Sequence, residues 1–185
     1  MSGVFVAIVG PSGVGKDSLI RLAQERLGRE MTFVRRVVTR PADGGSEDHD
    51  TMSAEDFARA EAAGQFALSW EAHGLRYGLP IALERDLAAG RIVVANLSRG
   101  VIPALMARYG DAVVVSVVAE REVIARRLAG RGRETADSIQ RRLERSVPGD
   151  RLPPGTVVID NSGALETAGA QLVRLLEDLA GLRVD

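Results

Sequence analysis

Residues 10–18 read Gly-Pro-Ser-Gly-Val-Gly-Lys-Asp-Ser, and the expected architecture follows from this stretch. An apolar, β-branched run at residues 4–9 precedes it and predicts a buried strand. Apolar residues at helical spacing follow over residues 19–27 and predict a helix. A Gly-rich turn between a buried strand and a helix N-terminus is typical of a phosphate-binding loop, because its backbone N–H groups can wrap an anion. The predicted phosphate-binding residues are Gly10, Pro11, Ser12, Gly13, Val14, Gly15, Lys16, Asp17 and Ser18.

Two residues of this loop carry particular chemistry. Lys16 is the only lysine among the 24 basic residues of the chain, and a compact ammonium suits a closed loop better than a forked guanidinium. The position after it, where a Ser or Thr usually holds magnesium, is Asp17, with Ser18 next. A carboxylate beside phosphates is favourable mainly if a cation lies between them, so Asp17 is a candidate ligand of Mg²⁺. The alternative is that Asp17 only interacts with the helix dipole.

Composition narrows the class of protein further. The 185 residues carry a net charge of −1, are 45% hydrophobic and contain no cysteine. This length predicts a single domain spanning residues 1–185, and the absence of Cys excludes disulfides and thiolate metal sites. The charge balance does not favour a nucleic-acid or membrane partner, and the apolar runs are too short to span a bilayer. We therefore expect a cytoplasmic protein with small-molecule substrates; oligomeric state is not predicted.

The remaining periodicity predicts alternating strands and helices. Further strands are expected at residues 32–40, 66–70, 74–78, 92–96, 112–118 and 157–160. Further helices are expected at residues 53–63, 80–90, 101–109, 120–128 and 165–179, the first of them started by a capping box at Ser53. Five buried strands alternating with helices predict an α/β fold with a doubly wound, five-stranded parallel sheet. Residues 41–78 are expected to form a small inserted acceptor-binding lobe.

A dense group of arginines runs from Arg121 to Arg151, over the predicted helix at residues 120–128, a Gly-containing loop and a second predicted helix. Arg131 lies between Gly130 and Gly132, and Arg142 lies on a predicted helix beyond it. A solvated basic surface is one explanation. The other is an arginine-rich lid, at about residues 129–151, because phosphoryl transfer between two anions requires cationic screening of the transferring group.

The order of these motifs resembles the guanylate kinase family of P-loop nucleoside monophosphate kinases. The matching segments are GPSGVGK (10–16), VTRP (38–41), EDF (55–57), SW (69–70), YG (77–78), RGRET (131–135) and IQRRL (139–143). Three positions at which that family reads guanine differ: the carboxylate before the tryptophan is Ser69, the hydroxyl after Tyr-Gly is Leu79, and the tyrosine of the acidic loop is His49 or Asp50. A guanine would leave donors unpaired at Ser69.

The departures resemble a sister group, the ribose 1,5-bisphosphate phosphokinases of phosphonate catabolism. The shared segments are GPSGVGKDSL (10–19), TRPADGGSEDH (39–49), ALSWEAHGLRYG (67–78), NLSR (96–99) and RGRE (131–134). The resemblance implies transfer of the terminal phosphoryl group of ATP, with Mg²⁺, to the 1-phosphate of ribose 1,5-bisphosphate. The products would be 5-phosphoribosyl 1-diphosphate (PRPP) and ADP.

The resemblance also implies residue roles. Lys16, Arg40, Arg131 and Arg142 would contact the phosphates being joined, and Asn161 would lie near the adenine of ATP. Arg40 and Arg99 are candidates for the sugar phosphates. Candidates for the ribose hydroxyls and the 1-phosphate are Ser69, Glu71, His73, Tyr77 and Asn96. For each of these, ordinary structural hydrogen bonding is the alternative.

Other functions compete with this one. A guanylate kinase with unusual acceptor contacts is disfavoured by Ser69 and Leu79. A guanylate-kinase-like binding module without activity is disfavoured because Lys16, the loop glycines and the lid arginines are all present. A GTP-hydrolysing switch would need a second lysine for its guanine-reading motif, which the sequence lacks.

Overall fold

The computed structural model describes residues 3–40, 49–129 and 152–181. Its centre is a five-stranded, fully parallel sheet, as predicted, and the structure gives the strand order as β2-β7-β1-β8-β9. The strands are β1 (Phe5–Val9), β2 (Thr32–Val34), β7 (Val93–Asn96), β8 (Val113–Val118) and β9 (Val157–Asp160). The central strand β1 is buried along its whole length, because helices cover both faces of the sheet.

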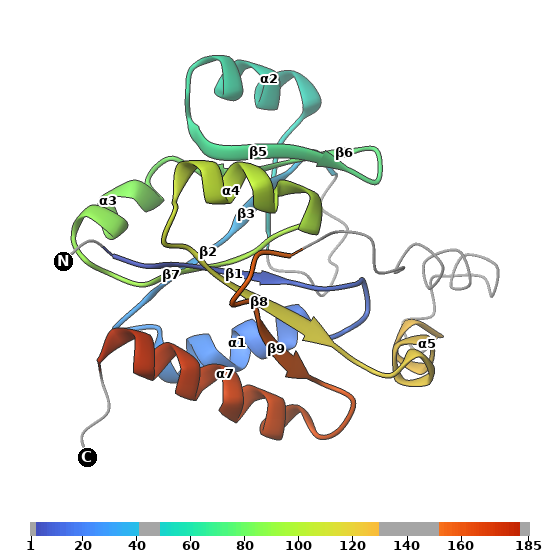
Figure 1. Cartoon of the computed structure of the whole chain (residues 1–185). Coiled ribbons are helices and arrows are strands. Elements are labelled where there is room, and N and C mark those ends of the chain that lie inside the picture. Colours follow the sequence, from blue (N-terminus) through green and yellow to red (C-terminus); the bar gives the residue numbers. More distant parts are fainter. Residues whose placement is uncertain (1–2, 41–48, 130–151, 182–185) are drawn as a thin grey trace.

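Side-chain alternation along β1 divides the core into two layers. Val6 and Ile8 pack into one cluster with α1 (Lys16–Leu27), α5 (Arg121–Ala129) and α7 (Leu165–Ala180). Phe5, Ala7 and Val9 pack into the other, toward α3 (Leu83–Ala88) and α4 (Ile102–Arg108). Figure 1 shows α1 and α7 below the sheet and α3 and α4 above it. Successive side chains of a strand point to opposite faces of the sheet, so the buried strand β1 contributes to a core layer on each side. Helices on both faces are the doubly wound arrangement that was predicted.

A second sheet lies above the first, in the order β4-β3-β6-β5. Its strands are β3 (Arg36–Val38), β4 (His49–Thr51), β5 (Phe66–Ala72) and β6 (Leu75–Pro80), and α2 (Ala54–Ala62) packs against β5. We call β3, β4, α2, β5 and β6 the lobe. Ser53 caps α2 as predicted, since its hydroxyl accepts a hydrogen bond from the Asp56 N–H at 3.0 Å.

Two predicted elements were wrong in their bounds. The single strand predicted at residues 32–40 is divided: β2 pairs with β7 in the parallel sheet, whereas β3 pairs with β4 and β6 in the lobe. The alternating pattern of a strand continues through β2 and β3. It therefore does not show that the strands with which this segment pairs change at Arg35. The helix predicted from Pro80 begins at Leu83, because Pro80 ends β6 opposite Phe66.

The remaining helices agree with the predicted ones within a few residues. A 3-10 turn, Arg99–Val101, precedes α4. Within the described ranges, no helix combines the length and the apolar character needed to cross a membrane. Arg131 and Arg142, together with most of the predicted lid, lie outside the described residues.

Candidate active site

The loop between β1 and α1 has the conformation expected of a phosphate-binding loop. Gly15 caps α1 in the left-handed region, with φ 98°, and Gly13 has φ 83°. A Cβ on Gly13 would lie 2.8 Å from the Leu128 side chain, and one on Gly15 would collide with the amide of Asn161. The loop therefore needs glycine both for its backbone angles and for the close approach of α5 and the segment after β9.

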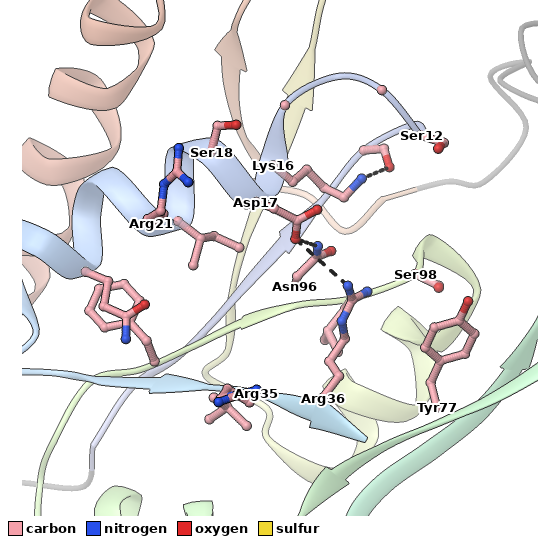
Figure 2. Close-up of a pocket in the computed structure, with 18 of the residues that line it drawn as sticks. Ser12, Lys16, Asp17, Ser18, Arg21, Arg35, Arg36, Tyr77, Asn96 and Ser98 are labelled. Atoms are coloured by element: carbon pink, nitrogen blue, oxygen red, sulfur yellow. Dashed lines mark hydrogen bonds and ion pairs between the residues drawn. The ribbon is translucent and has the colours of Figure 1, made fainter. Parts of the chain in front are cut away.

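Lys16 is the first residue of α1, and its ammonium folds back over the loop. The Nζ atom donates hydrogen bonds to the carbonyl oxygens of Gly10 at 2.8 Å and Pro11 at 3.0 Å. The ammonium therefore lies across the loop close to the start of α1 (Figure 2), where the first backbone N–H groups of a helix have no intrahelical partner. The site is therefore electrostatically prepared for an anion such as a phosphate.

Asp17 lies one residue further, where it meets two side chains from other elements (Figure 2). Its Oδ1 accepts a hydrogen bond of 2.7 Å from Nδ2 of Asn96, the last residue of β7. The same oxygen lies 3.9 Å from the Arg36 guanidinium of β3. Because β1 and β7 are neighbours, with Ile8 opposite Asn96, their carboxyl ends bring these groups together. Asp17 therefore connects the loop to the lobe.

Asn161 follows β9 and supports the loop from below. Its side chain is only 1% exposed, and its Nδ2 donates to the carbonyl of Val14 at 2.8 Å. Arg127 of α5, which belongs to the arginine-dense stretch but was not predicted to contact the loop, donates to the same carbonyl at 3.2 Å. In this structure both side chains contact the loop backbone, and a role of Asn161 beside adenine remains a prediction.

A cavity of about 730 Å³ opens between the loop and the lobe. Of the predicted acceptor-binding residues, His73, Tyr77 and Asn96 line it, together with most of the loop. His73 lies at the tip of the turn between β5 and β6, with a left-handed φ of 55°. The structure thus brings part of the predicted acceptor set to the phosphate-binding loop.

Ser69, Glu71, Arg40 and Arg99 are not among the described residues that line this cavity. The Ser69 hydroxyl donates to a carboxylate oxygen of Glu61 at 2.6 Å, and Arg76 donates to the other oxygen. The hydrogen bond from Ser69 is the main cause, and the Arg76 charge a smaller one, of a Glu61 pKa below its ordinary value. Glu71 is exposed, 3.8 Å from Arg76. In this structure Ser69 therefore stabilises the lobe from within.

Several cavity residues were missed in the sequence, above all Arg36, Arg35 and Ser98. Arg36 is only 8% exposed, and its guanidinium lies 5.8 Å from the centre of the Tyr77 ring. Arg35 pairs with Asp50 at 3.1 Å. The signal was available: two adjacent arginines interrupt the apolar run at residues 32–38, and alternation in a strand sends one of them inward.

The part of the chain that the structure describes holds no cluster of three or more His, Asp and Glu side chains placed to bind a metal ion. Among the described residues that line the cavity, Asp17 is the only carboxylate, and Ser18 follows it in the chain. The Oδ1 atom of Asn96 is buried and, among the described residues, has no hydrogen-bond partner. These are hard oxygen donors of the kind that Mg²⁺ prefers.

The fold and this loop define a P-loop phosphotransferase of guanylate kinase architecture. A family model described as an AAA domain matches residues 6–147. The solved guanylate kinase of Anaplasma phagocytophilum superposes with a TM-score of 0.69, covering 96% of this chain and 86% of that one, at 20% sequence identity. At this level of identity the superposition supports the fold alone.

Curated relatives give the family. A ribose 1,5-bisphosphate phosphokinase PhnN of Chelativorans sp. strain BNC1 is 52% identical over 181 residues, which are 96% of this chain and 87% of the relative. The protein of the same name from Agrobacterium fabrum is 48% identical over 95% of this chain and 97% of its own length. The chain belongs to the ribose 1,5-bisphosphate phosphokinase family, and the resemblance stated from its motifs is confirmed.

Proposed function

We propose that this chain transfers the terminal phosphoryl group of ATP to the 1-phosphate of ribose 1,5-bisphosphate, forming PRPP and ADP. The observation that carries the proposal is that the phosphate-binding loop and a basic wall of the lobe, with Arg36, Tyr77 and His73, face one cavity. One side suits the phosphates of a nucleotide, and the other suits an anionic acceptor. Relatives that match almost the whole chain bear the name of this activity.

On the donor side, Lys16 and the backbone N–H groups of the loop bind the phosphates of ATP. The Nζ contacts with Gly10 and Pro11 hold the ammonium at the loop before a nucleotide arrives. Asn161 and Arg127 fix the Val14 carbonyl, which keeps the loop in its cradle shape. Preorganised donors cost no rearrangement when charge develops during transfer, and this lowers the barrier.

The acceptor is already an anionic phosphate, so its attack needs no general base. Catalysis then consists of positioning two polyanions and neutralising their charge. Arg131 and Arg142 are expected, from the sequence, to close over the transferring group; both lie outside the described residues. Arg40 and Arg99 remain candidates for the sugar phosphates.

Magnesium fits the loop chemically. Asp17 and Ser18 would hold it, and the buried Oδ1 of Asn96 adds an oxygen acceptor nearby. Because Mg²⁺ usually keeps several waters and binds through one or two carboxylates plus substrate phosphates, a single Asp17 is sufficient. When bound, the ion neutralises charge on the phosphates of ATP.

Guanylate kinase activity is the second candidate, because the fold is that of a guanylate kinase. Two features of the lobe oppose it. Leu79, at the position of the family's hydroxyl, has a hydrocarbon side chain that is completely buried and cannot hydrogen-bond to a base. Ser69 stands where that family has a carboxylate, and its hydroxyl donates to Glu61, which Arg76 also engages. The N–H groups of a guanine bound in the lobe would have no hydrogen-bond acceptor. A binding site discriminates strongly against a ligand whose buried polar groups stay unpaired.

A coupled assay of ADP release tests the function. Purified protein with Mg²⁺ and ATP is given ribose 1,5-bisphosphate, GMP or AMP in parallel. We expect kcat/KM for the sugar bisphosphate to exceed that for either nucleotide by about 10⁴-fold, the scale of rejection when buried polar groups stay unpaired. Equal or better use of GMP would restore the guanylate kinase alternative, and no turnover with any acceptor would favour a binding module.

A further inference from the structure

Arg36 has an unusual position for a charged side chain. It is 8% exposed, yet it lies on β3 in the wall of the cavity. Burying a guanidinium costs several kcal/mol unless anions or aromatic rings compensate it. The Asp17 carboxylate is one such partner, but at 3.9 Å the ion pair is longer than a direct hydrogen bond. Asp17 gives its closer contact to Asn96, at 2.7 Å.

On its other side, Arg36 rests on a rigid platform. Its guanidinium lies over the Tyr77 ring, and that ring stacks on Trp70 with centroids 5.4 Å apart and planes 10° from parallel. The Trp70 Nε1 donates to the Ser98 hydroxyl at 2.9 Å, which ties the platform to the end of β7. Figure 2 shows Arg36 between Asp17 and Tyr77, with Ser98 beside Tyr77. The guanidinium is thus positioned next to the loop, with restricted freedom.

We propose that Arg36 binds the phosphate of the acceptor that receives the transferred phosphoryl group, and that Asp17 competes with this phosphate for the same guanidinium. This inference rests on the proposed function for the identity of the acceptor. Arg36 lines the same cavity as Lys16 and lies 3.9 Å from Asp17, the residue after Lys16, which is where an acceptor phosphate must meet the donor. A planar guanidinium can donate hydrogen bonds to two phosphate oxygens at once. This contact is stronger than the ion pair with Asp17, whose oxygen lies 3.9 Å away.

Competition has a consequence for binding. Before substrates bind, Asp17 compensates part of the charge of Arg36. An arriving phosphate must displace this carboxylate, so removing the Asp17 charge strengthens acceptor binding, and it does so through Arg36. Simple repulsion between Asp17 and the phosphate would also strengthen binding, but by the same factor whether or not Arg36 is present. Under simple repulsion, the effects of removing the Asp17 charge and of removing Arg36 on the free energy of acceptor binding are additive. Under competition they are not.

The test measures acceptor binding without turnover. Isothermal titration calorimetry with EDTA and no ATP gives Kd for ribose 1,5-bisphosphate, and inorganic phosphate serves as a second probe. Fluorescence of Trp70, the only tryptophan in the chain, reports on the platform during the same titrations. The variants are Arg36→Met, Arg36→Lys, Asp17→Asn and Asp17→Asn combined with Arg36→Met. The control is Arg59→Met, an exposed lobe arginine paired with Glu55 and Asp56.

We expect Arg36→Met to raise the acceptor Kd by about 10- to 100-fold, the range for hydrogen bonds to charged groups, with Kd for ATP changed by less than about 3-fold. Arg36→Lys retains the positive charge but loses the two parallel N–H donors of the guanidinium, and is expected to raise the acceptor Kd by about 10-fold. If the Met variant does not fold, this variant tests whether Arg36 binds the acceptor phosphate. Asp17→Asn should tighten acceptor binding in the native background, and this gain should shrink when Arg36 is Met.

Three results would overturn the proposal: an acceptor Kd unchanged in a folded Arg36→Met variant, equal weakening of ATP and acceptor, or an equal gain from Asp17→Asn in both backgrounds. The proposed function fails separately. If the native protein does not turn over ribose 1,5-bisphosphate, that function is lost, while inorganic phosphate still reports whether Arg36 binds a phosphate.

Discussion

At the scale of single residues, the site depends on charges held where water is partly excluded. Lys16 spans the loop through two carbonyl contacts, and Asp17 shares one oxygen between Asn96 and Arg36. Neither residue belongs to the apolar clusters that stabilise the fold. Their removal should therefore affect chemistry far more than folding.

Lys16→Ala should abolish phosphoryl transfer, because the ammonium is the mobile charge for the outer phosphates of ATP. The melting temperature should change by no more than about 4 °C, since the ammonium lies outside the apolar core and its hydrogen bonds to Gly10 and Pro11 are only partly buried. ADP release and a thermal melt measure the two effects. Arg26→Ala, an exposed residue in the last turn of the same helix, is the control and should retain full activity. Transfer at the native rate by Lys16→Ala would contradict the assignment.

At the scale of elements, the loop is held by parts that lie far along the chain. The turn after β9 places Asn161 under Val14, and α5 contributes Arg127 and the Leu128 side chain beside Gly13. The lobe has an equivalent support in Glu61 of α2, which joins Ser69 of β5 to Arg76 of β6. These contacts explain how short loops keep a fixed geometry.

Asn161→Ala should lower the free energy of unfolding by about 0.5–1.5 kcal/mol, because the Val14 carbonyl loses its buried amide donor and keeps the longer contact from Arg127. The Kd for ATP should rise as the loop loosens. Chemical denaturation and calorimetry measure the two quantities. Ser162→Ala is the matched control: this hydroxyl accepts a hydrogen bond from the Glu120 N–H just before α5 and donates one to the Asp160 carboxylate, and neither partner belongs to the loop. Its loss should cost stability without weakening ATP binding, whereas unchanged ATP affinity in Asn161→Ala would contradict the supporting role.

Glu61→Gln should destabilise the protein in a pH-dependent way. Ser69 and Arg76 lower the pKa of Glu61, so the carboxylate contributes stability at neutral pH. That contribution is lost as the pH falls through the lowered pKa, below the ordinary glutamate range near about 4.3. The difference in melting temperature between the native protein and Glu61→Gln should therefore be largest at neutral pH and shrink in acid. Glu55→Gln, on the exposed face of α2, should show a smaller and flatter difference; a Glu61→Gln difference that is constant with pH would disprove the ionic role.

At the scale of the whole molecule, the cavity lies between two sheets that meet at the carboxyl ends of β1 and β7. The chain passes from the parallel sheet to the lobe at Arg35, between β2 and β3. A nucleotide bound at the loop and an acceptor bound against the lobe would each require that the parallel sheet and the lobe are both folded. Ligand binding should therefore stabilise the complete molecule and not one part of it.

Mg²⁺ and ATP at 100 times the Kd should raise the free energy of unfolding by about 2.7 kcal/mol, equivalent to a shift of roughly 5–10 °C in melting temperature. Differential scanning calorimetry measures the shift, and a single transition is expected because both sheets share buried residues. Lys16→Ala should reduce the shift strongly. An equal shift in that variant would show that ATP binds elsewhere than at the loop.

The sequence alone determined the loop, the strand and helix that flank it, the parallel sheet and the family, because each depends on local periodicity or on residues close together in the chain. His73, Tyr77 and Asn96, which the resemblance made candidates for acceptor binding, line the cavity, and their role in binding stays a prediction. Tertiary structure alone decided which partners these segments have. Arg36 faces Asp17 because the chain leaves one sheet for another at Arg35, and Asn161 reaches Val14 because β9 closes the sheet beside β8. Ser69 binds Glu61 because α2 packs on β5. Periodicity reports which side of an element is apolar, whereas hydrogen-bond partners across 79 or 147 residues depend on strand order and register, which no local pattern encodes.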